Sequence, residues 1–471
     1  MKLNDEIKIS LILFISFLIF YALQIPYYTS KPDVIVFAIR SLADKPITEF
    51  AYLPKTTLLS GEALPNYHLG HTIILWIVYQ IMPFNIASTI WTSGFISSIS
   101  GSLIVILTYF IWRNLNFSNR ISITTSVIVG LVPSFWEQSV IGEVYALQYA
   151  FVMAFVLAYL KDKLILSSLF FMYANLVSPL SGLAFGLIFL KGYSKNNFKN
   201  AFIVGSTALL TYVVVYSIAG TNILDLLNGF DHAPENRGLT YRTIAFFGFI
   251  LVNFNFFIFY LIKGIKLSFS ELKNTLINLA VATSPQLLLI LLGATFFIEL
   301  GSFQLPVFWA LAFPLGYYLS KVKINKYYFA ISLIATVAFT YSLWIRTNIV
   351  VGKEREEAGK WLRVNGFNGI SVIGPWSVGV SVIQGRDGSN LNALQNYYIE
   401  KSCPGNEDLT KTQKDKLIIA SAKKLPFRVA ISKINLSGLN LDHYNPFDKI
   451  TNGNLEKLYE NDSVSLFKWE K

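Results

Sequence analysis

Two acidic residues flanked by aromatic side chains stand at the edge of a long apolar run, where they could do chemistry. The segment from Ser134 to Leu147 reads Ser-Phe-Trp-Glu-Gln-Ser-Val-Ile-Gly-Glu-Val-Tyr-Ala-Leu and separates two apolar runs. Carboxylates such as Glu137 and Glu143 are costly beside hydrocarbon and usually serve function there. Glu143 is therefore a candidate functional acid. The alternative is a helix N-cap or first-turn carboxylate that opens the next helix.

A second candidate acid, Asp33, follows the first apolar run and is the single carboxylate in the segment 27–40. Partial desolvation by its apolar neighbours would favour proton uptake, which suits a general base. The alternative role is a helix N-cap after Pro32.

Tyr67, His68 and His71 gather at the start of a short apolar run, 71–82, which we interpret as an interfacial helix. Phenol and imidazole groups at a helix N-terminus could hold a phosphate, aided by backbone N–H groups and the helix dipole. The alternative is that these rings simply span the membrane interface. No third metal ligand accompanies the two histidines, so the sequence does not predict a metal site.

The loop 221–242 contributes Arg237, Tyr241 and Arg242. Guanidinium groups offer paired donors to a phosphate headgroup. Alternatively, this is a solvated loop whose charges contribute little.

Composition indicates what must position these residues. Of the 471 residues 53% are hydrophobic, with 38 Phe and 25 Tyr, which predicts an α-helical polytopic membrane protein. Cys403 is the single cysteine, so no intrachain disulfide can form. About eleven membrane crossings are predicted, at 9–24, 86–112, 121–137, 144–160, 164–176, 180–191, 201–218, 241–262, 276–297, 304–319 and 327–346. The runs at 164–176 and 180–191 are short and could form a re-entrant pair broken at Ser178 and Pro179.

The net charge of +11 is explained by membrane topology and not by nucleic-acid binding. With the N-terminus in the cytoplasm, most Lys and Arg residues of the connecting loops fall on the cytoplasmic side, as the positive-inside rule expects. The transmembrane domain would be 1–346, with a first extracytoplasmic loop at 25–68. Residues 347–471 would form a small extracytoplasmic α/β domain, with strands at 370–374, 427–432 and 463–469 and helices at 354–364 and 410–424.

Three segments together resemble the GT-C superfamily of integral-membrane glycosyltransferases, in its prokaryotic branch related to protein O-mannosyltransferases. Residues 135–147 are similar to that branch's Phe-Trp-x-Gln and Glu-Val-Tyr-x-Leu signature. Pro65-Asn-Tyr-His-Leu69 looks like its Pro-Gly-Tyr-Pro-Leu element, and Asp33 falls where the family has its first-loop acid. The sequence departs from the family at Val34-Ile-Val36, which lacks a second acid, and at Ala63-Leu64, where the family has His-Pro.

The resemblance implies a glycosyltransferase that moves a sugar from a polyprenyl-phosphate donor to a protein, glycan or lipid acceptor outside the cytoplasm. Asp33 would be the general base, and Glu143 would bind the sugar or orient a base. Whether a divalent cation takes part stays open. The implied phosphate-binding residues are Arg237, Arg242, His68 and Tyr67, and the implied sugar- or acceptor-binding residues are Tyr145, Trp136, His71 and Tyr241. Trp136 and Tyr145 could instead mark the aromatic belt.

Two other classes of protein fit part of the sequence. A transporter of lipid or solute would explain many crossings and interrupted helices, but it would place ionisable residues near the midplane and often show repeated halves. A noncatalytic subunit of a glycosylation complex would explain the missing second acid.

Overall fold

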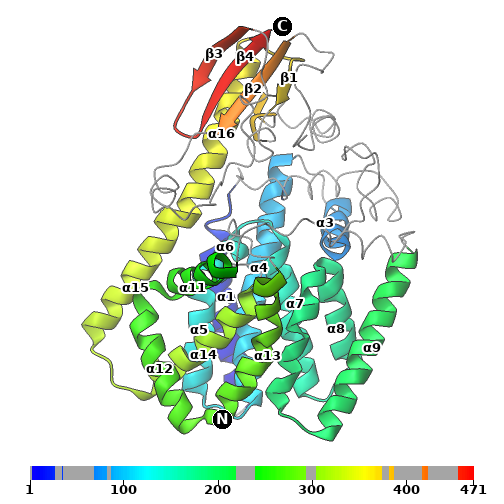
Figure 1. The fold of residues 1–471 in the computed structure, drawn as a ribbon, viewed down its shortest axis with the longest axis vertical. Helices are drawn as coiled ribbons and strands as arrows, with labels where there is room; N and C mark the ends of the chain where they lie inside the picture. Colours follow the sequence, from blue (N-terminus) through cyan, green and yellow to red (C-terminus); the bar gives the residue numbers. More distant parts are fainter. Residues whose placement is uncertain are drawn as a thin grey trace.

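The protein is a bundle of helices that carries a small sheet at one end, while the N-terminus lies at the other (Figure 1). The computed structural model describes residues 3–26, 34, 68–81, 86–218, 239–292, 304–373, 381–383, 385–386, 416–422 and 454–470. The helices of the first half are α1 (Leu3–Ala22), α3 (Leu69–Ile81), α4 (Ile86–Asn114), α5 (Asn119–Leu131), α6 (Pro133–Val140), α7 (Val144–Leu160), α8 (Leu164–Val177), the 3-10 helix η3 (Pro179–Lys191) and α9 (Lys195–Ile218). Those of the second half are α11 (Leu239–Phe254), η4 (Asn255–Phe257), α12 (Ile258–Glu271), α13 (Lys273–Leu292), α14 (Leu305–Lys321), α15 (Lys326–Thr340), the π-helix η7 (Tyr341–Ile345) and α16 (Arg346–Val364).

Fewer helices are long enough to span a membrane than the apolar runs predicted. Within the described ranges, three helices have the length and apolar character of a span, namely Ile90–Asn114, Lys195–Ile218 and Thr243–Glu271. Counting the bent pair α6 and α7 as one span gives up to four, so the eleven predicted crossings are not confirmed. The run predicted over 121–137 is divided, because Pro133 begins a new helix at α6. Proline lacks an N–H and is therefore tolerated in the first turn of a helix but not in its interior.

Apolar side chains fill the bundle and also cover much of its outside. Trp112 on α4 stacks against Trp309 and Phe313 on α14, with ring centroids 5.1 and 4.1 Å apart. On the outside, Phe202 on α9 and Phe259 on α12 are 76% and 57% exposed. An apolar interior combined with an apolar outer face is what lipid surroundings require.

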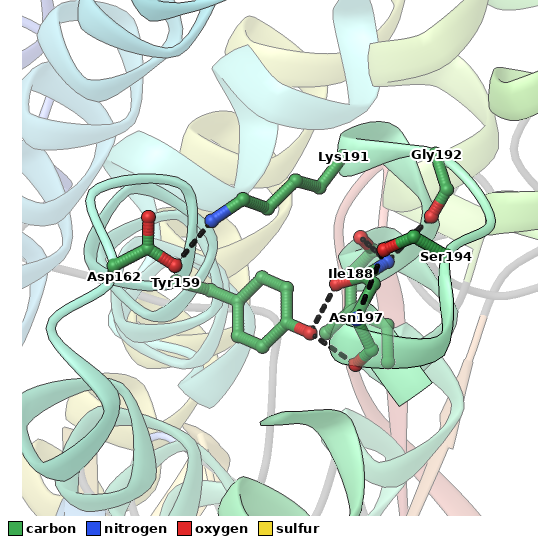
Figure 2. Close-up of polar contacts among 7 residues, drawn as sticks. All are labelled: Tyr159, Asp162, Ile188, Lys191, Gly192, Ser194 and Asn197. Carbon is green, nitrogen blue, oxygen red and sulfur yellow. Dashed lines mark hydrogen bonds and ion pairs between the residues drawn. The ribbon is translucent and has the colours of Figure 1, made fainter. Parts of the chain in front are cut away.

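Polar contacts at the end away from the sheet hold two turns of the bundle together (Figure 2). The Tyr159 hydroxyl, at the end of α7, donates to the Asn197 carbonyl of α9 at 2.8 Å and to the Asn197 side-chain oxygen. The Asn197 amide nitrogen in turn donates to the Gly192 carbonyl. Lys191 forms an ion pair with Asp162 beside them. Each of these polar groups therefore has a partner within the protein.

The tail of the chain forms a four-stranded mixed sheet against a long helix. The strands are β1 (Ser371–Ile373), β2 (Lys416–Ala422), β3 (Asn454–Glu460) and β4 (Val464–Glu470), in the order β1-β2-β4-β3. The β1 and β2 strands are parallel and the other pairs antiparallel. Helices α15 and α16 are joined through the π-helix, so the helical path crosses residue 346, where we placed the boundary between domains. That division stays a prediction.

The predicted strands at 370–374 and 463–469 are confirmed as β1 and β4, whereas the helix predicted at 410–424 is wrong. That segment contains β2, which lies between β1 and β4. Ile418, Ile419 and Ala420 are all fully buried. In a strand that is covered on both faces, apolar residues follow one another without alternating with polar ones. Such a continuous apolar run resembles part of a buried helix. The predicted strand at 427–432 lies outside the described residues.

Candidate functional site

The turn between α6 and α7 carries Glu143 and is formed by a sharp change of direction. Helix α6 ends at Val140, and α7 begins at Val144 at an angle of 113° to it. Gly142 lies in the turn, where an added Cβ would meet Ser93 Oγ of α4 at 2.5 Å. A side chain at this position would therefore push the turn away from α4. Glycine permits the close approach that fixes where Glu143 stands.

Three serines of α4 hold the backbone of this turn. Ser93 Oγ donates to the Gly142 carbonyl at 2.9 Å, and Ser97 Oγ donates to the Glu143 carbonyl at 3.3 Å. Ser98 Oγ donates to the Ser139 carbonyl at 2.9 Å. We did not single out these serines in the sequence. The available signal was a run of small residues within an apolar helix, which is typical of close helix packing in membranes.

The Glu143 side chain is 2% exposed, although it stands at the end of a helix. Glu143 occupies the N-cap position of α7, as the alternative interpretation expected, but its side chain makes no capping hydrogen bond. Glu137, on α6, is also 2% exposed. The structure therefore keeps two carboxylic acids inside the protein next to one turn, which is the usual setting of a functional acid.

The two aromatic residues of the motif are part of the interior. Trp136 Nε1 donates to Gln24 Oε1 at 3.0 Å, and its ring packs against Phe20 of α1 with centroids 4.7 Å apart. Tyr145 is 9% exposed and belongs to the main apolar core. Contact of Trp136 and Tyr145 with a sugar stays a prediction.

Asp33 and Tyr67 lie outside the described residues, but Val34, the neighbour of Asp33, is described. Val34 is fully buried, and its Cγ1 lies 3.0 Å from the position that a Gly142 Cβ would take. Val34 also packs in one cluster with Leu362 of α16 and Ile418 of β2. The chain next to Asp33 thus reaches both the turn that carries Glu143 and the tail sheet.

Helix α3 is fixed to the end of α8. His68 Nδ1 lies 2.8 Å from the Val177 carbonyl, and because a carbonyl only accepts, Nδ1 carries the proton. The Tyr173 hydroxyl donates to the Gly70 carbonyl at 2.9 Å. His71 is fully buried, and burial, followed by the charge of His68, lowers the pKa of His71 to about 3. The His71 ring is therefore neutral at neutral pH.

The predicted basic loop is described in part. Arg237 lies outside the described residues, and Tyr241 and Arg242 stand in the first turn of α11. Helix α11 caps α6, because the Ser134 N–H donates to Asn253 Oδ1 of α11 at 2.8 Å. This cap, which the sequence analysis missed, fixes the motif helix from its other side. Among the described residues, no three His, Cys, Asp or Glu side chains come together as a metal site.

The fold is similar to those of three solved structures, although no protein-family model and no curated protein matches the sequence. ArnT from Cupriavidus metallidurans in the apo state matches with a TM-score of 0.55 and 11% identity, over 99% of this chain and 97% of that one. The same protein bound to undecaprenyl phosphate gives 0.54 and 10%, with the same coverage. The apo oligosaccharyltransferase from Archaeoglobus fulgidus gives 0.50 and 11%, over 85% of this chain and 64% of that one. The chain thus shares its overall fold with ArnT and with this oligosaccharyltransferase, and its long apolar helices fit a membrane protein.

Proposed function

We propose that the protein transfers a hexose from a polyprenyl-phosphate carrier to an acceptor hydroxyl at the end of the bundle that carries the sheet. The fold supports this proposal, because ArnT, which shares it, has been solved with undecaprenyl phosphate bound. The apolar outer face of the bundle suits a donor that arrives from the membrane. In this proposal the N-terminus is cytoplasmic and the sheet is extracytoplasmic. The two lie at opposite ends of the molecule (Figure 1).

The observation that carries the proposal is the contact of Val34 with Gly142. This contact brings Val34, the residue of the first loop that directly follows Asp33, to the turn that holds Glu143. Asp33 directly precedes Val34 in the chain, and we propose that its carboxylate acts at this turn. We assign Asp33 as the general base and Glu143 as the group that binds the sugar or orients the base.

In the transfer step, the acceptor oxygen attacks the anomeric carbon of the sugar, and its proton passes to the Asp33 carboxylate. The bond from that carbon to the phosphate oxygen breaks, and its electron pair stays with the departing lipid phosphate. Tyr67, Arg237 and Arg242 would stabilise this developing charge. His68 would join them through Nε2, since its Nδ1 faces the Val177 carbonyl.

The experiment is a transfer assay with the purified protein in lipid nanodiscs, labelled undecaprenyl-phosphate hexoses and a panel of peptide and glycan acceptors. We expect Asp33→Asn to lower the transfer rate by about 10²–10⁴-fold, the usual contribution of a general base. Asp162→Asn is the matched control, since Asp162 pairs with Lys191 at the other end of the bundle. Transfer that Asp33→Asn leaves unchanged would remove Asp33 from the mechanism.

A further inference from the structure

A small hollow lies inside the bundle where α7, η3, α13 and α14 meet. Gln148 and Tyr149 of α7 and Gln286 of α13 supply its polar lining, while Leu180 of η3 and Leu305 of α14 are among its apolar walls. No charged side chain is among the described residues that line it. In the present conformation it has room for about one water molecule.

One polar group that lines this hollow, and another directly beside its lining, are buried without a partner among the described residues. The Tyr149 side chain is 2% exposed, and its hydroxyl makes no hydrogen bond with the described part of the protein. The side-chain oxygen of Gln304, which directly precedes Leu305, is likewise buried without a partner among the described residues. Leaving a buried polar group unsatisfied costs about 1–3 kcal/mol, so native proteins seldom do so without a reason.

The position of the hollow relates it to the candidate site. Tyr149 comes six residues after Glu143 on the same helix, which places it about 9 Å further along α7. The hollow therefore lies below the turn that carries Glu143, toward the interior of the bundle.

We propose that this hollow receives one hydroxyl group of an uncharged sugar, and so selects the donor by its sugar. The inference rests on the proposed function. A phosphate would need a cation or several N–H donors, and the described lining offers no cation. A polyprenyl tail would leave the Tyr149 hydroxyl unpaired in an apolar contact. A sugar hydroxyl both donates and accepts, and it has the size of the water that fits.

The test compares the affinity of the purified protein in nanodiscs for a lipid phosphate with its affinity for the same lipid carrying a sugar, both measured by intrinsic tryptophan fluorescence. The probes are undecaprenyl phosphate and undecaprenyl phosphate linked to mannose or to glucose. Tyr149→Phe removes only the hydroxyl. We expect it to weaken binding of the preferred sugar-linked lipid about fivefold, the value of one hydrogen bond, and to leave binding of undecaprenyl phosphate unchanged.

Thermal stability separates a ligand-binding hydroxyl from a structural one. Because the Tyr149 hydroxyl has no partner among the described residues, Tyr149→Phe should keep or raise the melting temperature. Tyr327→Phe, at a tyrosine that is 81% exposed, is the control for the chemical change.

A lower melting temperature for Tyr149→Phe, or equal effects on both lipids, would overturn the inference and leave the proposed function standing. If neither lipid bound the unmodified protein, the inference and the proposed function would both fall.

Discussion

Buried side-chain amides near the two ends of α7 differ in whether they form hydrogen bonds. At the end away from the sheet, Asn197 is 4% exposed, and its side chain both accepts from Tyr159 and donates to the Gly192 carbonyl (Figure 2). Near the other end, Gln138 is fully buried, and neither amide atom has a partner in the described part of the chain. A hydrogen-bonded buried amide adds to the stability of a fold, whereas a buried amide without partners lowers it.

This difference agrees with the proposed function, in which the ligand binds at the end of the bundle that carries the sheet. Contacts such as the ion pair of Lys191 with Asp162 close the lower turns against one another. Around the α6–α7 turn, the backbone is held by serines, whereas the Gln138 amide and the Tyr149 hydroxyl have no partner among the described residues. Active sites are commonly the places where a protein gives up stability for function.

The largest expected effect comes from replacing the two amides by leucine. Asn197→Leu should destabilise the protein by about 2–4 kcal/mol, because it removes several hydrogen bonds and leaves the Tyr159 hydroxyl and the Gly192 carbonyl with fewer partners. Gln138→Leu should cost no stability, since it removes unsatisfied polar atoms. Thermal unfolding in detergent measures both changes.

Activity should respond in the reverse order. We expect Gln138→Leu to lower the rate of sugar transfer about tenfold, the loss of one or two hydrogen bonds to a ligand. Asn197→Leu should leave the rate of the folded fraction unchanged. A strongly destabilised Gln138→Leu variant would show that this amide serves the fold, and the contrast between the two ends would disappear.

The second effect concerns pH. Burial lowers the pKa of His71 to about 3, whereas an unfolded histidine titrates near 6.5. Its contribution to stability is therefore present above pH 6.5 and is lost as the pH falls toward 3, because the unfolded chain binds the proton first. Between pH 7 and pH 5 the loss is about 2 kcal/mol. His71→Gln should make the free energy of unfolding less dependent on pH between pH 7 and pH 5. An unchanged pH dependence would show that His71 is not buried in its neutral form.

The smallest effect comes from the serines of α4. Ser93→Ala and Ser97→Ala each remove one hydrogen bond to the α6–α7 turn, which is worth about 0.6 kcal/mol in a membrane. Ser100→Ala is the matched control, since Ser100 Oγ donates to the Ile96 carbonyl within α4 itself. We expect all three variants to be similarly stable, but only the first two to slow transfer. Equal rates would mean that the turn does not position Glu143.

The sequence was sufficient to predict the class of protein and the ends of several elements. The break of α8 at Ser178 and the strands β1 and β4 follow from proline, from alternation and from apolar length. The burial of Glu143 also agrees with its place beside an apolar run. These features depend on residues that are close together in the chain.

Features that depend on distant residues could not be predicted in this way. The contact of Val34 with Gly142 and the cap that Asn253 forms on α6 join segments about a hundred residues apart. The strand β2 was mistaken for a helix, because its pairing with β1 and β4 depends on segments that are distant in the chain. The eleven predicted crossings are not confirmed, because apolar length alone does not show where a helix bends, as at the turn between α6 and α7.

The central claim is that Asp33 and Glu143 meet at one site on the sheet side of the bundle. Crosslinking tests it directly, in a Cys403→Ser background, with a thiol reagent that spans about 8 Å, little more than two Cα spacings. The account predicts a crosslink between Asp33→Cys and Glu143→Cys. It predicts none between Asp33→Cys and Asp162→Cys, because the 17 residues of α7 separate the two ends by about 25 Å. Absence of the first crosslink, or equal yields of both, would contradict the account.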